Sequence, residues 1–245
     1  MNLVLLDAAE LSADGTAHLA GRRAAHAAGV LGAAPGARLR VGVVGGRLGT
    51  GEVVASAPDA LVLRVVLDEE PPPRAPVDLL LALPRPKILR KVLQAAASMG
   101  VARIALVGSY RVEKSYFGSP LLQPDALAAE LRLGLEQGRD TIAPAVELHR
   151  FFKPFVEDVL DRVFTGGARL LAHPGAAPPL ADLGGAPARA LLAVGPEGGW
   201  TPYEAAELAR RGFATFSLGP RVLRVDTAVP YAVGQVELWL RTRRG

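Results

Sequence analysis

The sequence contains no cysteine, which excludes disulfide bonds and any zinc or iron–sulfur site held by thiolates. Its four histidines are far apart and lack the spacing of a metal-binding motif: His18, His26, His149 and His173. The patterns G-x-G-x-x-G and G-K-[ST], typical of dinucleotide and nucleoside triphosphate sites, are also missing. We therefore expect neither a resident metal nor one of these two nucleotide sites.

Long apolar runs are missing as well. No run approaches the ~18–20 residues that a transmembrane helix needs. The first residues meet Asp7 and Glu10 at once, without the basic region that opens an export signal. We expect no membrane span and no export, which leaves the cytoplasm as the default location.

The composition is that of a folded protein with a modest basic excess. Half of the 245 residues are hydrophobic and the net charge is +4, so the chain can bury one large core or two small ones. Only four of the 28 basic residues are lysines, and arginine suits bidentate contacts to phosphate. A GC-rich genome would produce the same bias, so a nucleic-acid partner is supported but not established by charge.

A proline-rich segment predicts two domains. Residues 68–76 read Asp-Glu-Glu-Pro-Pro-Pro-Arg-Ala-Pro, which favours a stiff, extended spacer. Before it, short β-branched runs alternate with glycine turns, and we expect a small β-barrel or sandwich there. The predicted division is a first domain over residues 1–70, a linker over 71–77 and a second domain over 78–245.

The second domain alternates apolar runs with helix-like segments, which predicts an α/β fold with a parallel sheet. Helices are expected near residues 85–99 and 126–137, each followed by a glycine, and from about 227 to 241. Strands are expected at residues 79–83, 104–107, 170–172, 191–194 and 213–218.

A glycine loop follows the strand expected at residues 191–194. It reads Gly195-Pro196-Glu197-Gly198-Gly199, and Thr201 with Glu204 then forms a capping-box pattern for a new helix. At the carboxyl end of a parallel strand such a loop offers main-chain groups to a ligand. By itself, a tight turn that needs glycine for positive φ explains the same residues.

A charged loop follows the next strand, residues 213–218. Gly219-Pro220-Arg221-Val222-Leu223-Arg224 leads to Asp226 and an apolar helix. Because loops at the carboxyl edge of a parallel sheet form its ligand sites, we expect both loops to face one pocket.

Together these two motifs, about twenty residues apart, resemble the RsmE family. Its members are methyltransferases of the SPOUT class that use S-adenosylmethionine to methylate N3 of a uridine in the decoding region of 16S ribosomal RNA. Arg23-Ala24-Ala25-His26 and Gly134-Leu135-Glu136-Gln137-Gly138-Arg139 resemble the family too. The resemblance implies a PUA-like β-barrel that contacts RNA, a trefoil-knotted α/β domain, a homodimer, and 16S rRNA or the small ribosomal subunit as partner.

The resemblance also implies a cofactor bound largely by the main chain of three loops. Carried over by position, the cofactor-binding residues are Leu171, His173, Gly195, Pro196, Glu197, Gly198, Gly199, Leu218, Gly219, Leu223 and Arg224.

The catalytic candidates follow from the chemistry of the uracil. N3 is protonated at neutral pH, so the site must favour its anion, and a guanidinium beside the carbonyls would do so. Arg224 is the first candidate and Arg221 the second. Asp226 either accepts the N3 proton or has a structural role, by fixing Arg224 or capping the helix. The family usually has Glu at this position, so Asp226 is a departure, and residues 91–100 lack the acidic residue that the family carries there.

RNA contacts are expected at two places. Arg111, Lys114 and Tyr116 lie in a loop that mixes cations with aromatics, which suits stacking on unpaired bases, although a surface loop with Phe117 folded back fits equally well. Arg23 and His26 are the candidates in the first domain.

Rival interpretations remain open at this point. An inactive RNA-binding knot protein, a methyltransferase for a different RNA uridine, and an α/β enzyme that binds a nucleotide or phosphate each fit part of the pattern. In the last helix, Tyr231, Val236 and Trp239 belong either to a dimer surface or to the core of one chain.

Overall fold

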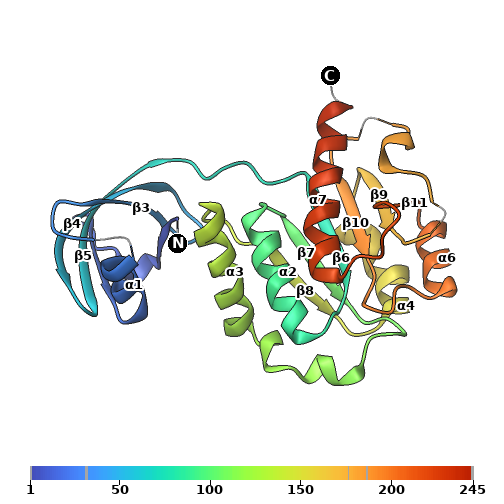
Figure 1. Cartoon of the computed structure of the whole chain (residues 1–245), viewed down its shortest axis with the longest axis horizontal. Coiled ribbons are helices and arrows are strands. Elements are labelled where there is room, and N and C mark those ends of the chain that lie inside the picture. Colours follow the sequence, from blue (N-terminus) through green and yellow to red (C-terminus); the bar gives the residue numbers. More distant parts are fainter. Residues whose placement is uncertain (1, 31–32, 176, 186, 244–245) are drawn as a thin grey trace. The chain divides into compact units, whose positions relative to one another are not determined.

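The computed structural model describes residues 2–30, 33–175, 177–185 and 187–243. The chain forms two compact units (Figure 1). Unit 1 consists of Met1–Pro73 and Leu131–Ala143, and unit 2 of Arg74–Glu130 and Pro144–Gly245. The proline-rich segment thus lies where the chain first passes from one unit to the other.

Unit 1 is built on a five-stranded mixed sheet in the order β1-β3-β4-β5-β2. Strand β1 pairs parallel with β3 and the other pairs are antiparallel. At Gly49 a Cβ atom would lie 1.8 Å from the main-chain oxygen of Val66, so only glycine permits this approach of β4 to β5. The bounds are β1 (Val4–Leu6), β2 (Thr16–Ala20), β3 (Arg38–Val43), β4 (Leu48–Ala57) and β5 (Ala60–Glu69).

One helix completes the core of unit 1. Helix α1 (Arg22–Val30) places Ala24 and Ala27 against buried side chains of the sheet such as Leu19 and Leu63. The small alanine side chains let the helix approach the sheet closely.

The second half of α3 (Pro124–Gly138) and the residues after it also belong to unit 1. The main-chain N–H of Gly45 donates to Thr141 O at 2.8 Å, and Arg132 pairs with Asp7 at 2.8 Å. The sequence pattern does not indicate this return of the chain, because an apolar helix face does not show which sheet it will cover. The division at residues 1–70, 71–77 and 78–245 stays a prediction.

Helix α3 ends in an unexpected way. Gly138 is its last residue, and Arg139 takes the left-handed conformation with φ = 56°. Glycine is the usual residue in this position after a helix. A non-glycine residue there carries conformational strain.

Unit 2 contains a six-stranded, fully parallel sheet in the order β11-β9-β10-β6-β7-β8. Five of these strands lie at the apolar runs of the sequence, which confirms the strands predicted there. The sixth, β8, was not predicted, because this edge strand is only partly buried and lacks a continuous apolar run. The bounds are β6 (Val77–Ala82), β7 (Arg103–Val107), β8 (Ala145–His149), β9 (Ala168–Ala172), β10 (Ala190–Val194) and β11 (Phe213–Phe216).

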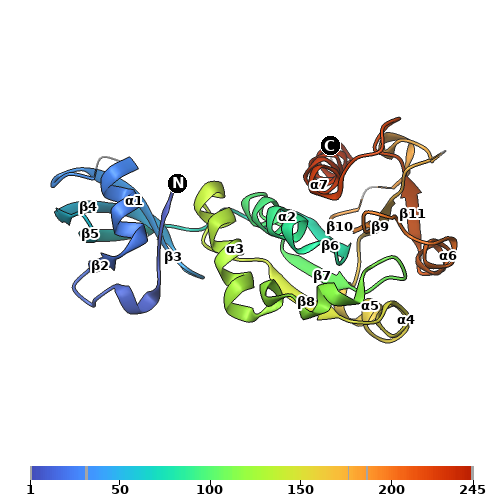
Figure 2. The same ribbon diagram turned by 60° about the horizontal axis from the view of Figure 1, so that its bottom comes forward.

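Helices cover both faces of this sheet (Figures 1 and 2). Helices α2 (Pro86–Ser98) and α7 (Val225–Thr242) pack together on one face, where α7 also contacts β10 and β6. The opposite face carries α4 (Phe152–Pro154), α5 (Leu160–Val163) and α6 (Pro202–Arg210). Shorter turns are η1 (Ala8–Glu10), η2 (Lys114–Gly118), η3 (Pro120–Leu122), η5 (Leu180–Asp182) and the π-helical η4 (Phe155–Val159).

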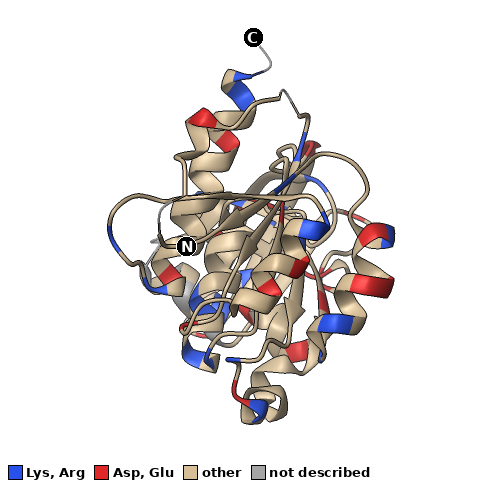
Figure 3. Ribbon diagram, turned by 90° about the vertical axis from the view of Figure 1, so that its right-hand side faces the viewer, with Lys and Arg blue, Asp and Glu red and all other residues tan. Residues whose placement is uncertain are grey.

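Charged residues of both signs are interspersed on the helices and loops in Figure 3. In the described ranges, no helix combines the length and the apolar character needed to cross a membrane. The fold is therefore an α/β architecture with one mixed and one parallel sheet, which confirms the α/β part of the expected class. The barrel and the knot stay predictions.

Candidate functional site

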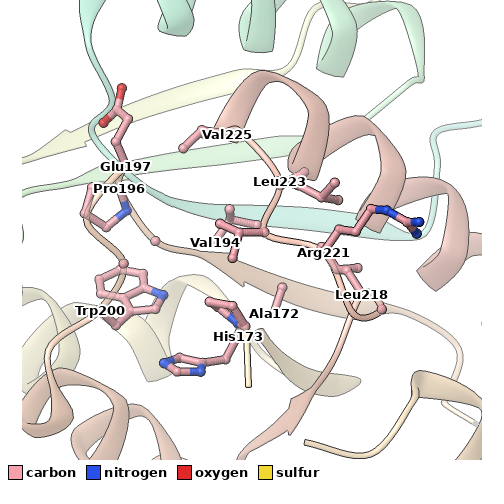
Figure 4. Close-up of a pocket in the computed structure, with 16 residues that line it drawn as sticks. Ala172, His173, Val194, Pro196, Glu197, Trp200, Leu218, Arg221, Leu223 and Val225 are labelled. Carbon is pink, nitrogen blue, oxygen red and sulfur yellow. The ribbon is translucent and has the colours of Figure 1, made fainter. Parts of the chain in front are cut away.

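The loops that follow β9, β10 and β11 meet at one pocket (Figure 4). This is the carboxyl edge of the sheet, where parallel strands place ligands. Nine residues predicted from the sequence line it: His173, Gly195, Pro196, Glu197, Gly199, Leu218, Gly219, Arg221 and Leu223. The structure thus brings the two motifs to one place, as expected.

The main chain of the glycine loop packs closely against Trp200. At Gly195 a Cβ would lie 3.0 Å from Trp200 N and 3.2 Å from Trp200 Cδ1. Gly199 has φ = 70°, and its N–H donates to Pro196 O at 2.8 Å, which closes the turn. Thr201 and Glu204 form the predicted capping box at the start of α6. The loop is therefore a tight turn anchored to a well-capped helix.

The charged side chains of the loops do not fill the pocket. In Figure 4 the carboxylate of Glu197 and the guanidinium of Arg221 point away from its centre. Glu197 Oε1 instead accepts a hydrogen bond from the main-chain N–H of Arg85 at 3.1 Å. The pocket consequently offers apolar side chains and main-chain groups to a ligand.

Other predicted cofactor-binding residues lie elsewhere. Leu171 is buried inside β9, at 1% exposure, and does not line the pocket. The main-chain oxygen of Gly198 accepts a hydrogen bond from the Arg111 guanidinium. Arg224 precedes α7, and its side chain is 76% exposed.

Four lining residues lie outside the three loops that the resemblance implied: Val194, Trp200, Val225 and Ala228. Ala172, Pro174 and Val222 lie within those loops and were not singled out as site residues. Trp200 had a visible signal, because it directly follows the glycine loop, and a large aromatic beside small residues forms a wall. Its indole Nε1 is buried without a hydrogen-bond partner within the described structure. The apolar residues carry no comparable signal in the sequence.

Asp226 is held between two cations. Its Oδ2 accepts a hydrogen bond from Lys91 Nζ at 2.8 Å, and its Oδ1 lies 3.5 Å from Arg224 Nε. The Lys91 ammonium, with a smaller contribution from Arg224, holds the pKa of the Asp226 carboxyl below its usual range. A carboxylate stabilised in this way accepts a proton less readily than a free one.

The helix-capping alternative for Asp226 is wrong. Helix α7 begins at Val225, two residues earlier than expected, and its N-cap is Arg224. Asp226 is thus a residue of the first turn, where its negative charge interacts favourably with the helix dipole.

Residues 70–237 match the sequence profile of the RNA methyltransferase domain family. The chain is 30% identical to the ribosomal RNA small subunit methyltransferase E of Treponema pallidum, an alignment that covers 93% of this chain and 87% of the relative. The chain belongs to the RsmE family. The Mycobacterium bovis relative of the same name is 32% identical over 86% of this chain and 82% of its own.

The fold is also that of a solved RsmE protein. The crystal structure of the Neisseria gonorrhoeae ribosomal RNA small subunit methyltransferase E, bound to S-adenosylmethionine, has a TM-score of 0.76 at 21% identity. The match covers 97% of each chain.

The five predicted RNA-binding residues of this RsmE protein fall into two groups. In unit 1, Arg23 binds Glu10 and donates to Leu5 O at 2.8 Å, and the side chain of His26 lies outside the described part. In unit 2, Arg111 contacts the glycine loop, Lys114 is exposed and Tyr116 is half-buried. All five stay predictions.

The last helix of this RsmE protein divides between core and surface. Val236 and Trp239 are buried within the chain, at 0% and 6% exposure, so for these two the core interpretation holds. Tyr231 is 49% exposed. In the described part of the chain, no three His, Asp or Glu side chains are grouped as a metal site requires.

Proposed function

We propose that this protein transfers a methyl group from S-adenosylmethionine to N3 of a uridine in the decoding region of 16S rRNA. The single observation that carries the proposal is the pocket at the ends of β9, β10 and β11, which unites both sequence motifs in a chain of the RsmE family. The Neisseria gonorrhoeae relative, of the same fold, was solved with this cofactor bound.

The pocket fits such a cofactor. Apolar side chains such as Val194, Leu223 and Trp200 suit an adenine ring, and the loops after β10 and β11 present main-chain groups for polar atoms. The buried Nε1 of Trp200, which has no partner among the described residues, adds a hydrogen-bond donor in the wall. When bound, S-adenosylmethionine supplies an electrophilic methyl group.

Arg224 is the proposed catalytic residue. It sits at the end of the loop that lines the pocket, and its guanidinium is largely exposed and free to approach a bound base. A guanidinium beside the uracil carbonyls stabilises the N3 anion, so that the proton leaves to water and N3 becomes nucleophilic. Arg221 lines the pocket with its guanidinium turned away from the centre, and it is the second candidate.

Asp226 is proposed as a positioning residue. Its contacts with Lys91 Nζ and Arg224 Nε restrain the arginine from one side and leave the terminal nitrogens for the substrate. In this arrangement the negative charge orients the arginine. Its lowered pKa argues against service as the general base.

The resemblance to the family also implies a domain arrangement, an oligomeric state and a cellular location. We propose that the mixed sheet of unit 1 forms a PUA-like β-barrel that contacts RNA, and that unit 2 is knotted. We further propose a homodimer, for which the exposed Tyr231 on α7 is the surface candidate, and a cytoplasmic location.

The decisive experiment measures transfer of labelled methyl to small ribosomal subunits that lack the decoding-region mark. The product is digested to nucleosides, and Arg224→Ala is run beside the wild type. We expect N3-methyluridine from the wild type only. Label in another nucleoside or RNA would retain the enzyme class and overturn the substrate. Cofactor binding without any label would favour an inactive RNA-binding protein.

A further inference from the structure

A second pocket lies on unit 2 beside the first. It is bounded by the loop after β7, the turn after β8 and the start of α6. Tyr110, Phe151 and Tyr203 line it and are 87%, 67% and 53% exposed. Among the described residues, four aromatic side chains are exposed, and these are three of them. An exposed aromatic cluster of this kind marks a binding surface.

The main chain builds this pocket firmly. At Gly108 a Cβ would lie 2.1 Å from Arg150 O, so the chain packs closely where β7 and β8 end, and Tyr110 and Phe151 follow these ends in the lining of one pocket. The N–H of Tyr110 donates to Glu204 Oε1 at 2.8 Å, which fastens the same loop to α6. The loops that carry the aromatic side chains are thus held in place by close main-chain packing and a hydrogen bond.

The rim of the pocket is basic. Lys114, Arg150 and Lys153 are exposed and line it. Glu204 is the one acidic residue in the described lining, and it is buried and engaged by Tyr110 and Thr201. Ser109 also lines the pocket, and its buried Oγ has no hydrogen-bond partner in the described structure. Aromatic faces with surrounding cations suit a polyanion that carries flat rings.

The second pocket adjoins the cofactor pocket. Phe152 lines the second pocket and Trp200 lines the first, and the two rings contact each other with centroids 5.7 Å apart. A group bound in one pocket therefore lies a few side chains from a group in the other.

We propose that the second pocket binds an unpaired nucleotide adjacent to the one that is methylated, with its base stacked on Tyr110, Phe151 or Tyr203 and its phosphates beside Lys114 and Lys153. The proposal rests on the function proposed above and extends it to the substrate's conformation. A neighbouring base that is stacked here must be splayed out of a helix, so the pocket selects single-stranded or locally opened RNA.

The test uses the full-length protein and a short single-stranded RNA that carries 2-aminopurine beside a uridine. Stacking on an aromatic ring quenches this fluorophore. We expect quenching by the wild type. In each of the three single variants Tyr110→Ala, Phe151→Ala and Tyr203→Ala we expect the dissociation constant to rise roughly 5- to 100-fold. The matched variants Tyr110→Phe, Phe151→Tyr and Tyr203→Phe keep the rings and should retain both binding and quenching.

The contribution of the cationic rim is measured by the salt dependence of RNA binding. Lys114→Met and Lys153→Met should each reduce the slope of log K against log salt by about 0.7, the value for a phosphate contact to a single strand. Calorimetry with S-adenosylmethionine should give wild-type affinity for every variant and so report an intact fold.

The outcomes separate the two proposals. If the wild type methylates RNA while the alanine variants keep its affinity and quenching, the second-pocket proposal is overturned alone. A wild type that methylates small ribosomal subunits but neither binds nor quenches the short RNA overturns the second-pocket proposal alone. A wild type that binds the cofactor but transfers no methyl to subunits overturns the proposed function as well. Alanine variants that change the sedimentation coefficient and leave RNA binding intact would make the aromatic surface a contact between protein chains, against the proposal.

Discussion

The buried carboxylate of Glu204 accepts a hydrogen bond from the main-chain N–H of Tyr110 at 2.8 Å, across 94 positions of sequence. The same carboxylate accepts from the N–H of Thr201 at 2.9 Å. The Glu204 side chain therefore fixes the junction between the glycine loop and α6, and it also attaches the loop after β7 to the start of α6. Both pockets depend on this link, because Trp200 lies in one and Tyr110 in the other.

Replacing Glu204 tests this link. Glu204→Ala leaves two main-chain donors without partners, and we expect the free energy of unfolding to fall by about 2–4 kcal/mol. Urea denaturation measures the change. Glu207→Ala on the same helix removes a carboxylate that pairs with Arg210 at the surface and should cost no more than about 1 kcal/mol. Equal losses in both variants would contradict a special role for Glu204.

The close packing at Gly195 predicts a cofactor-binding defect. In Gly195→Ala the new methyl group would press on Trp200, and we expect S-adenosylmethionine to bind roughly 5- to 100-fold more weakly by calorimetry. Gly184→Ala serves as the control, since a Cβ there meets nothing within 4 Å. Wild-type affinity in Gly195→Ala would show that the loop tolerates a side chain and would refute this account.

The pair of Asp226 and Lys91 predicts a dependence of stability on pH. Because the folded protein holds the pKa of Asp226 below the ordinary value of 3.8, the pair stabilises the fold fully above about pH 4 and loses its effect as the pH falls through the folded pKa. Asp226→Asn should therefore be less stable than the wild type at neutral pH, and the difference should disappear in strong acid. Thermal melts at several pH values measure it.

The same variant separates positioning from proton transfer. If Asp226 only orients Arg224, the pH profile of kcat between about pH 3 and 9 keeps its shape in Asp226→Asn while the rate falls. Loss of the acidic limb of the profile in the variant would instead identify Asp226 as the base.

The left-handed conformation of Arg139 predicts a stabilising substitution. Arg139→Gly should raise the free energy of unfolding by about 0.5–1 kcal/mol, because glycine adopts φ = 56° without strain. Arg139→Ala keeps the strain and should leave stability within about 0.5 kcal/mol of the wild type. If the alanine variant were stabilised equally, the gain would come from the lost arginine side chain and not from the backbone.

Much of the chain could be predicted from local patterns. The apolar runs predicted five of the six strands of the parallel sheet, and Thr201 with Glu204 predicted the start of α6, because both signals depend only on neighbouring residues. The two loop motifs indicated the RsmE family, and the comparisons confirmed it. Nine residues of the pocket had been carried over by position from the family resemblance, and the expectation that both loops face one pocket followed from the rule that parallel strands end at one edge of a sheet.

Only the tertiary structure decided which distant groups meet. It placed Lys91 on Asp226, buried Leu171 inside β9, and brought Tyr110, Phe151 and Tyr203 around one pocket. It also returned residues 131–143 to the first unit. Such pairings join residues far apart in the sequence, and they follow from the packing of whole helices and sheets. The sequence by itself determined most of the secondary structure, the family and the loops that carry the site, because those depend on local patterns of residues. The partners of each side chain emerged only when the chain had folded.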